Sequence, residues 1–257
     1  MIGKGKAISH TKESIKYGWN QDKDAAIVFK QHLAGDSPKE ITDEFKIIQS
    51  MKEICKRNTI SFVLSPTIED GEKLNNTHLH AIVSEFIKDL KFDEHQAIAF
   101  VHNDKNHKHV HLYINRIDFK GNAYKDNFIG KRAQKAAERI AEKLELKTVK
   151  QIRDERLEKV KDIRGFIKEK HEYCFKKLNP KTSLDYINQM RQLNINVIPV
   201  SNKSNELIGF RYEYKNTNLK GSEVHRSLSI NKLRPQFKEE KNKKNYEKNR
   251  RSSSITG

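Results

Sequence analysis

The chain has 257 residues and a mass of 30.1 kDa, and its 51 lysine and arginine residues outnumber 34 acidic residues, giving a formal net charge of +17. Its mean hydropathy is −0.87, and its apolar runs, such as residues 97–101, are too short for a membrane-spanning helix. This charge favours nucleic acid or an anionic membrane surface as the partner, because neutralised phosphates release their counterions.

The amino-terminal residues are basic but lack the apolar stretch of a secretory signal, so we expect a cytoplasmic protein. Cys55 and Cys174 lie far apart, without the spacing of a disulfide framework or a zinc site, and both are expected to be reduced. Residues 3–8 fit a strand. Residues 9–11 then offer hydroxyl caps for a short helix that runs toward Tyr17.

A helix, a strand and a second helix follow. The capping box at residues 37–40, with proline at the first helical position, predicts a helix over about 38–55. Residues 59–65 alternate apolar and polar side chains and stop before a proline, as a strand does. Residues 76–90 have a helical apolar spacing that can cover one face of a sheet, and its members are Leu79, Ile82, Val83, Phe86, Ile87 and Leu90.

Residues 95–102 and 108–118 predict two strands, and the polar loop 103–107 between them is typical of an antiparallel hairpin. Residues 131–144 then predict a basic amphipathic helix. We place the edge of a first domain, residues 1–150, directly after this helix.

Beyond residue 150 the composition changes to a long, charge-dense segment. Residues 151–180 are interpreted as a charged helical connector, 181–235 as a small α+β accessory module, and 236–257 as a basic disordered tail. Three aromatic residues of the module, Phe210, Tyr212 and Tyr214, share one strand face. We expect them in its core, and base-stacking platforms are the alternative.

The histidines separate by geometry. His78 and His80 lie two apart on a helix and point in roughly opposite directions, so both are expected on the surface. His109 and His111 lie two apart on a strand and share a face.

The register of the hairpin brings a third histidine to this pair. Pairing His102 with His109 places Phe100 opposite His111, so that the three imidazoles converge. The other face of the hairpin then carries only apolar residues, which are Ala97, Ala99, Val101, Val110, Leu112 and Ile114.

Three imidazoles with open coordination positions are typical of a catalytic metal site. We expect Mn²⁺ or Mg²⁺, with Zn²⁺, Co²⁺ and Ni²⁺ as alternatives. His107 competes with His102 as the third ligand, and a closed zinc site or a wet sheet surface is the structural alternative. Asp104, Asn106 and His107 are candidates for hydrogen bonds to the imidazoles, although turn formation equally explains Asp104 and Asn106.

Residues 102–116 read HNDKNHKHVHLYINR and resemble the HxDxxHxHxHxxxNR signature of plasmid and transposon mobilization relaxases, which are HUH endonucleases. The likeness covers roughly residues 1–150, because Tyr17 and the acidic pair Glu69 and Asp70 follow the family's order. It implies an α+β fold with a five-stranded antiparallel sheet backed by helices, followed here by a helical extension and the small module.

The resemblance also implies an activity, which is site- and strand-specific nicking of single-stranded DNA at a transfer origin to initiate conjugative mobilization. In this family a tyrosine attacks phosphorus, frees a 3′-hydroxyl and leaves a 5′-phosphotyrosyl enzyme. By position, Tyr17 is the nucleophile. The metal ligands by the same comparison are His102, His109 and His111.

A phenol has a pKa of about 10 and needs activation before it attacks. Glu69 or Asp70 is the candidate base, and a solvated acidic loop is the alternative reading of this pair. Tyr113, on the histidine face, and Tyr124, after the next turn, are rival nucleophiles.

DNA contacts are expected from the cationic residues Lys105, Lys108, Arg116, Lys131, Arg132, Lys135 and Arg139. The expected partners are accessory mobilization proteins and a separate helicase, since the chain has no recognisable helicase motif, and no membrane insertion is expected. The competing function is a non-catalytic single-stranded DNA-binding protein with a structural histidine metal site.

Overall fold

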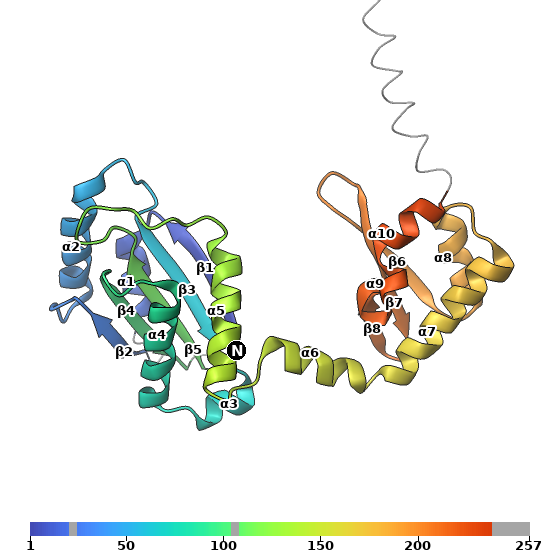
Figure 1. Ribbon diagram of the computed structural model, residues 1–257, viewed down its shortest axis with the longest axis horizontal. Helices are drawn as coiled ribbons and strands as arrows, with labels where there is room; N and C mark the ends of the chain where they lie inside the picture. Colours follow the sequence, from blue (N-terminus) through green and yellow to red (C-terminus); the bar gives the residue numbers. More distant parts are fainter. Residues whose placement is uncertain (21–24, 104–107, 238–257) are drawn as a thin grey trace, which may run out of the picture. The chain divides into compact units, whose positions relative to one another are not determined.

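The computed structural model describes residues 1–20, 25–103 and 108–237 (Figure 1). The chain divides into two compact units, Met1–Arg153 and Asp154–Gly257. The finer subdivision expected from the sequence, with boundaries at 150, 180 and 235, stays a prediction, and the expected tail lies outside the described residues from position 238 onward. Across the described ranges, no helix combines the length and the apolar character needed to cross a bilayer.

The first unit is built on a five-stranded antiparallel sheet of order β1-β3-β5-β4-β2. Its strands are β1 (Ile2–Ile8), β2 (Ala26–Gln31), β3 (Thr59–Ser65), β4 (Ala97–His102) and β5 (His109–Asn115). This confirms the predicted fold class, an α+β fold with a five-stranded antiparallel sheet and helices.

Helices α4 (Asn76–Leu90) and α5 (Ile129–Lys143) cover one face of this sheet (Figure 1). The six hairpin residues assigned to this face are all buried in the core there, which confirms the predicted alternation. The predicted apolar stripe of α4 is buried in full. Helix α5 approaches β1 so closely that a Cβ on Gly3 would lie 2.6 Å from the Cβ of Ala137.

Helices α1 (Thr11–Gly18) and α2 (Pro38–Gln49) cover part of the opposite face. The small core beneath them consists of Ile15, Ile41, Phe45, Ile98, Phe100 and Tyr113. The face that carries the histidines is therefore divided. A second hydrophobic cluster lies beneath α1 and α2, and the histidines lie at the hairpin end of β4 and β5.

Several local features differ from the sequence prediction. The side chain of His10, which precedes α1, makes no capping bond, and Thr11 Oγ1 lies 2.6 Å from Thr59 Oγ1, so the hydroxyl-capped start expected at 9–11 does not form. Helix α2 ends at Gln49 and continues as the 3₁₀ turn η2 (Ser50–Lys52), short of residue 55. Strand β2 was not expected, because a bulge between Ile27 and Phe29 breaks its alternation.

The second unit packs helices against a three-stranded antiparallel sheet of order β6-β7-β8. Its elements are α7 (Lys161–Tyr173), the π-helical turn η3 (Cys174–Leu178), α8 (Ser183–Gln192), β6 (Asn196–Ser201), β7 (Leu207–Tyr214), β8 (Thr217–Lys220), α9 (Gly221–Val224), η4 (Arg226–Leu228), α10 (Ile230–Leu233) and η5 (Arg234–Gln236), with α6 (Val149–Glu158) before them. Phe210 and Tyr212 are buried in its core, as expected, and Tyr214 packs against it. Ile167 and Cys174, from the predicted connector, belong to the same core.

Candidate active site

Strands β4 and β5 bring three histidines together. The pairs His102–His109 and Phe100–His111 lie opposite one another, which confirms the predicted register. One ring nitrogen of each histidine lies within 4.8 Å of the others, and the ring centroids are between 4.5 and 5.4 Å apart. His102 and His109 are buried and His111 is partly exposed. The cluster can hold a metal ion.

The hydrogen bond of His102 fixes its protonation pattern. His102 Nε2 lies 3.0 Å from the carbonyl oxygen of Gly18. A carbonyl only accepts, so Nε2 carries the proton and Nδ1 keeps its lone pair. Nδ1 is buried and has no hydrogen-bond partner among the described residues. A buried lone pair without a donor is costly, and a cation would satisfy it, so this set of imidazoles fits a divalent metal.

Tyr17 lies beside this cluster, in the last turn of α1. Its ring centroid is 5.5 Å from that of His102 and 5.2 Å from that of His111, and the residue is 43% exposed. The next residue, Gly18, makes this approach feasible, because a Cβ there would lie only 2.4 Å from Phe100 Cδ2. Sequence reasoning missed this role of Gly18. The signal that could have indicated it is the position of a glycine directly after the candidate nucleophile.

The two rival tyrosines are placed differently. Tyr113 is buried in the core beneath α1 and α2, and burial raises the pKa of its phenol well above the usual value. Tyr124 packs against the core on the other face of the sheet, and its hydroxyl donates to the carbonyl oxygen of Leu90 at 2.6 Å. Burial raises the pKa of Tyr124 as well. Of the three tyrosines, Tyr17 is therefore the accessible one next to the histidines.

A cavity of about 380 Å³ leads away from Tyr17 and His111. It crosses β3 at Ser61 and Val63 and reaches Lys6 on β1. Its walls mix apolar and polar side chains, and they include one ammonium group, that of Lys6, and one carboxylate, that of Glu13, neither of which the sequence interpretation selected.

The acidic pair after β3 is held elsewhere. Glu69 and Asp70 lie in the first turn of α3 (Ile68–Lys73). The carboxylate of Glu69 pairs with Lys147 Nζ at 2.9 Å, and Asp70 Oδ2 accepts the backbone N–H of Lys147 at 3.0 Å. The hydrogen bond from Lys147 lowers the pKa of Glu69. A role of either residue as the activating base stays a prediction, which these contacts do not support.

The hairpin cations that the sequence interpretation assigned to DNA make internal contacts. Arg116 donates to Asp126 Oδ1 at 2.9 Å and to the carbonyl oxygen of Tyr124, and Lys108 donates to the carbonyl oxygen of Leu74 at 2.6 Å. Both side chains therefore hold loops of the first unit together.

The basic helix α5 lies on the sheet face opposite the histidines. Arg139 pairs with Asp89 at 2.6 Å, Arg132 donates to Lys125 and Tyr124, and Lys131 lies over the ring of Phe128. Lys135 is exposed on the same helix. DNA binding by these four residues stays a prediction.

The loop residues Asp104, Lys105, Asn106 and His107 lie outside the described residues, so their predicted roles are untested. His78 and His80 are exposed, as expected. His78 Nδ1 accepts the backbone N–H of Asn75 and so helps to cap α4, and the ring of His80 lies against Phe29.

Residues 16–146 match the protein family described as relaxase, MobA/VirD2-like, nuclease domain. No curated protein and no solved structure matches the chain. The family match covers about half of the chain and includes four of the five strands of the sheet, β2 to β5, together with Tyr17 and the three histidines. The protein therefore belongs to the MobA/VirD2-like relaxases, which are DNA-binding endonucleases and transesterases.

Proposed function

We propose that this protein nicks single-stranded DNA at a transfer origin, with Tyr17 as the nucleophile, and thereby initiates conjugative mobilization. The observation that carries the proposal is the approach of an exposed tyrosine to three clustered histidines, with Tyr17 and His111 lining the same cavity. A non-catalytic binding protein would not require a phenol at this position.

Each side chain has a defined task in the proposed reaction. His102, His109 and His111 would hold a divalent cation, Mn²⁺ or Mg²⁺, which when bound would neutralise the charge of the phosphate as a Lewis acid. The carbonyl of Gly18 keeps the proton of His102 on Nε2, which leaves Nδ1 for the cation. Lys6 adds positive charge where the strand enters.

The bond changes are a transesterification. The phenol of Tyr17 loses its proton, and its oxygen attacks the scissile phosphorus. The bond from phosphorus to the 3′-oxygen breaks, and this oxygen takes up a proton to become a 3′-hydroxyl. The 5′-phosphate stays on Tyr17, and this ester retains the energy needed to rejoin the strand later. Accessory mobilization proteins and a separate helicase would supply the single-stranded substrate.

The test is covalent trapping on DNA. Single-stranded oligonucleotides that together cover the DNA beside the coding sequence are labelled at their 3′ ends and incubated with the full chain and Mn²⁺. The label is placed there because the fragment downstream of the nick is the one that stays on Tyr17. We expect a denaturation-resistant adduct with the wild type and none with Tyr17→Phe, which should still bind the oligonucleotide. Tyr173→Phe is the matched control, because Tyr173 is 47% exposed and lies in the second unit.

The same assay tests the metal site. His109→Ala should abolish the adduct and weaken Mn²⁺ binding measured by calorimetry, because one of three nitrogen ligands is lost. His78→Ala, which removes an exposed histidine, should change neither the amount of adduct nor the binding of Mn²⁺. An adduct that persists in Tyr17→Phe, or equal losses in the two histidine variants, would contradict the assignment.

A further inference from the structure

Helix α1 has two exposed flanks, and only one of them belongs to the site described above. Tyr17 lines the cavity over β3, whereas Lys12 and Lys16, one turn apart, line a separate cavity between α1 and α2. This second cavity has a volume of about 460 Å³. Together with Lys39 and Lys46 of α2, these lysines form what we call the lysine groove.

The lysine groove is strongly cationic. Its lining has four ammonium groups and one carboxylate, that of Asp43. Asp43 Oδ2 lies 2.9 Å from Lys39 Nζ. That hydrogen bond is the largest cause that lowers the pKa of Asp43, and the charges of Lys46 and Lys12 lower it further. The positive charges therefore converge on one place from two different helices.

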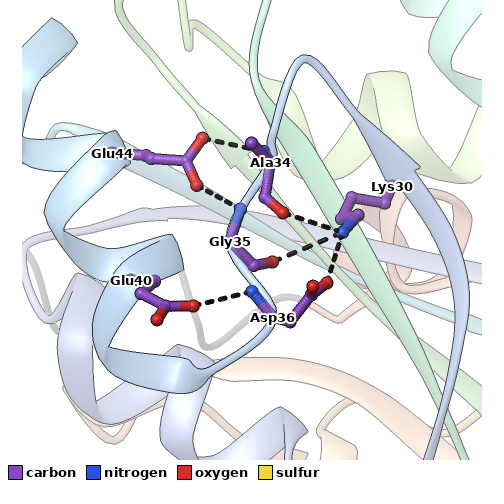
Figure 2. Close-up of polar contacts among 6 residues, drawn as sticks. All are labelled: Lys30, Ala34, Gly35, Asp36, Glu40 and Glu44. Atoms are coloured by element: carbon purple, nitrogen blue, oxygen red, sulfur yellow. Dashed lines mark hydrogen bonds and ion pairs between the residues drawn. The ribbon is translucent and has the colours of Figure 1, made fainter.

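The wall formed by α2 is held in position by the loop before it (Figure 2). The carboxylate of Glu44 accepts the backbone N–H groups of Ala34 and Gly35 at 3.0 and 2.6 Å. Lys30 Nζ donates to the carboxylate of Asp36 at 3.0 Å from the opposite side. The first turns of α2, which carry Lys39 and Asp43, therefore start from a fixed loop.

Two features of the groove decide what kind of partner it suits. Its remaining lining is formed by Pro38 and Thr42 and by the methylene stems of the lysines, and none of the described residues that line it is aromatic. Protein interfaces depend on buried aromatic or arginine anchors, which this groove lacks. Lysine ammonium groups are instead point charges that bind phosphates.

We propose that the lysine groove binds the phosphate backbone of single-stranded DNA that flanks the scissile site. This rests on the proposed function, because the groove is relevant to a strand held at Tyr17 only in that Lys12 and Lys16 lie on the same short helix as Tyr17. The groove lies on the other flank of that same helix, so the DNA on one side of the nick is held while the phosphate is presented to Tyr17.

The experiment measures binding, without cleavage. A fluorescent single-stranded oligothymidylate is titrated with the full chain in EDTA, and the logarithm of the association constant is followed against the logarithm of the salt concentration. Each phosphate contact contributes about 0.7 to the slope for single strands, so Lys12→Gln with Lys16→Gln should reduce the slope by about 1.4. Asp43→Asn should shift it in the opposite direction, because Lys39 is then freed for a phosphate.

Lys88→Gln with Lys91→Gln is the matched control. It removes the same charge at the end of α4, which covers the opposite face of the sheet, and should leave the slope unchanged. An unchanged slope in the groove variant, or an equal fall in the control, would overturn the proposal. Because nothing is cleaved in EDTA, failure of this test leaves the chemistry of Tyr17 standing, and a misassigned nucleophile would leave this result standing.

Discussion

Gly18 illustrates how a single residue sets the geometry of the site. A glycine near the end of a helix is usually a cap in the left-handed region, but among the described glycines only Gly121 has a positive φ. Gly18 is needed for space instead, because its Cβ position lies against the rings of Phe100 and Tyr113. The missing side chain lets α1 end on the sheet, with its carbonyl on His102.

Gly18→Ala should therefore impair chemistry more than folding. The added methyl must displace α1 from Phe100, and a displacement of about 1 Å costs on the order of 10²-fold in rate. The rate of adduct formation with a cognate oligonucleotide measures this loss. Gly165→Ala is the control, because a Cβ there meets nothing within 4 Å. A full adduct rate in Gly18→Ala would show that α1 adapts without moving Tyr17.

The histidine cluster was predictable from sequence because strand alternation is a local rule. The roles of Asn115 and Arg116 were not, although both belong to the same motif. Asn115 Nδ2 donates to the carbonyl of Phe45, and Arg116 donates to Asp126. These partners come from other loops and elements, so their contacts exist only once the chain has folded.

Elements were predictable where one physical signal was strong. The strand at 59–65 and the helix at 76–90 form with the expected bounds, since a proline ends the first and a continuous apolar stripe defines the second. Strand β2 gave no such signal, because it is an edge strand with a bulge. The alternation within 108–118 predicted a strand, which forms over 109–115, and its inner face, but not that α1 and α2 would cover part of the other face.

The loop between β2 and α2 is predicted to contribute stability through Glu44. In Glu44→Ala the backbone N–H groups of Ala34 and Gly35 lose their acceptor, and we expect the free energy of unfolding to fall by about 1 kcal/mol, since the loop is partly solvated. Urea unfolding followed by the fluorescence of Trp19, the one tryptophan of the chain, measures this change. Trp19 packs against the same small core as Leu33 of this loop.

Glu53→Ala is the corresponding control. Glu53 is exposed and makes no hydrogen bond to another described residue, so its removal should leave the urea midpoint in place. Equal midpoints for Glu44→Ala and the wild type would mean that water replaces the carboxylate without cost.

At the scale of the whole molecule, the family resemblance predicted a five-stranded antiparallel sheet but not the order of its strands, because no local pattern specifies which strands become neighbours. The central position of β5, between β3 and β4, is what places the histidines over the middle of the sheet. The family match ends at residue 146, so it does not extend into the second unit, whose fold rests on its own core.

That second core contains an ionisable group which makes its stability depend on pH. His171 is buried on α7, with Nδ1 3.0 Å from the hydroxyl of Tyr186, and burial lowers its pKa to about 4. The pKa of an unfolded histidine is about 6.5, so between these values the unfolded chain binds a proton that the folded chain does not. The free energy of unfolding should therefore fall as the pH drops from about 6.5 toward 4.

Between pH 7 and pH 5, protonation of His171 should lower the free energy of unfolding by about 2 kcal/mol. Urea unfolding of the full chain, followed by far-ultraviolet circular dichroism, measures it, while Trp19 fluorescence reports the first unit separately. His171→Gln, whatever its stability at pH 7, should lose correspondingly less on acidification, because glutamine binds no proton. Parallel losses in the wild type and the variant would show that His171 gains its proton without opening the core.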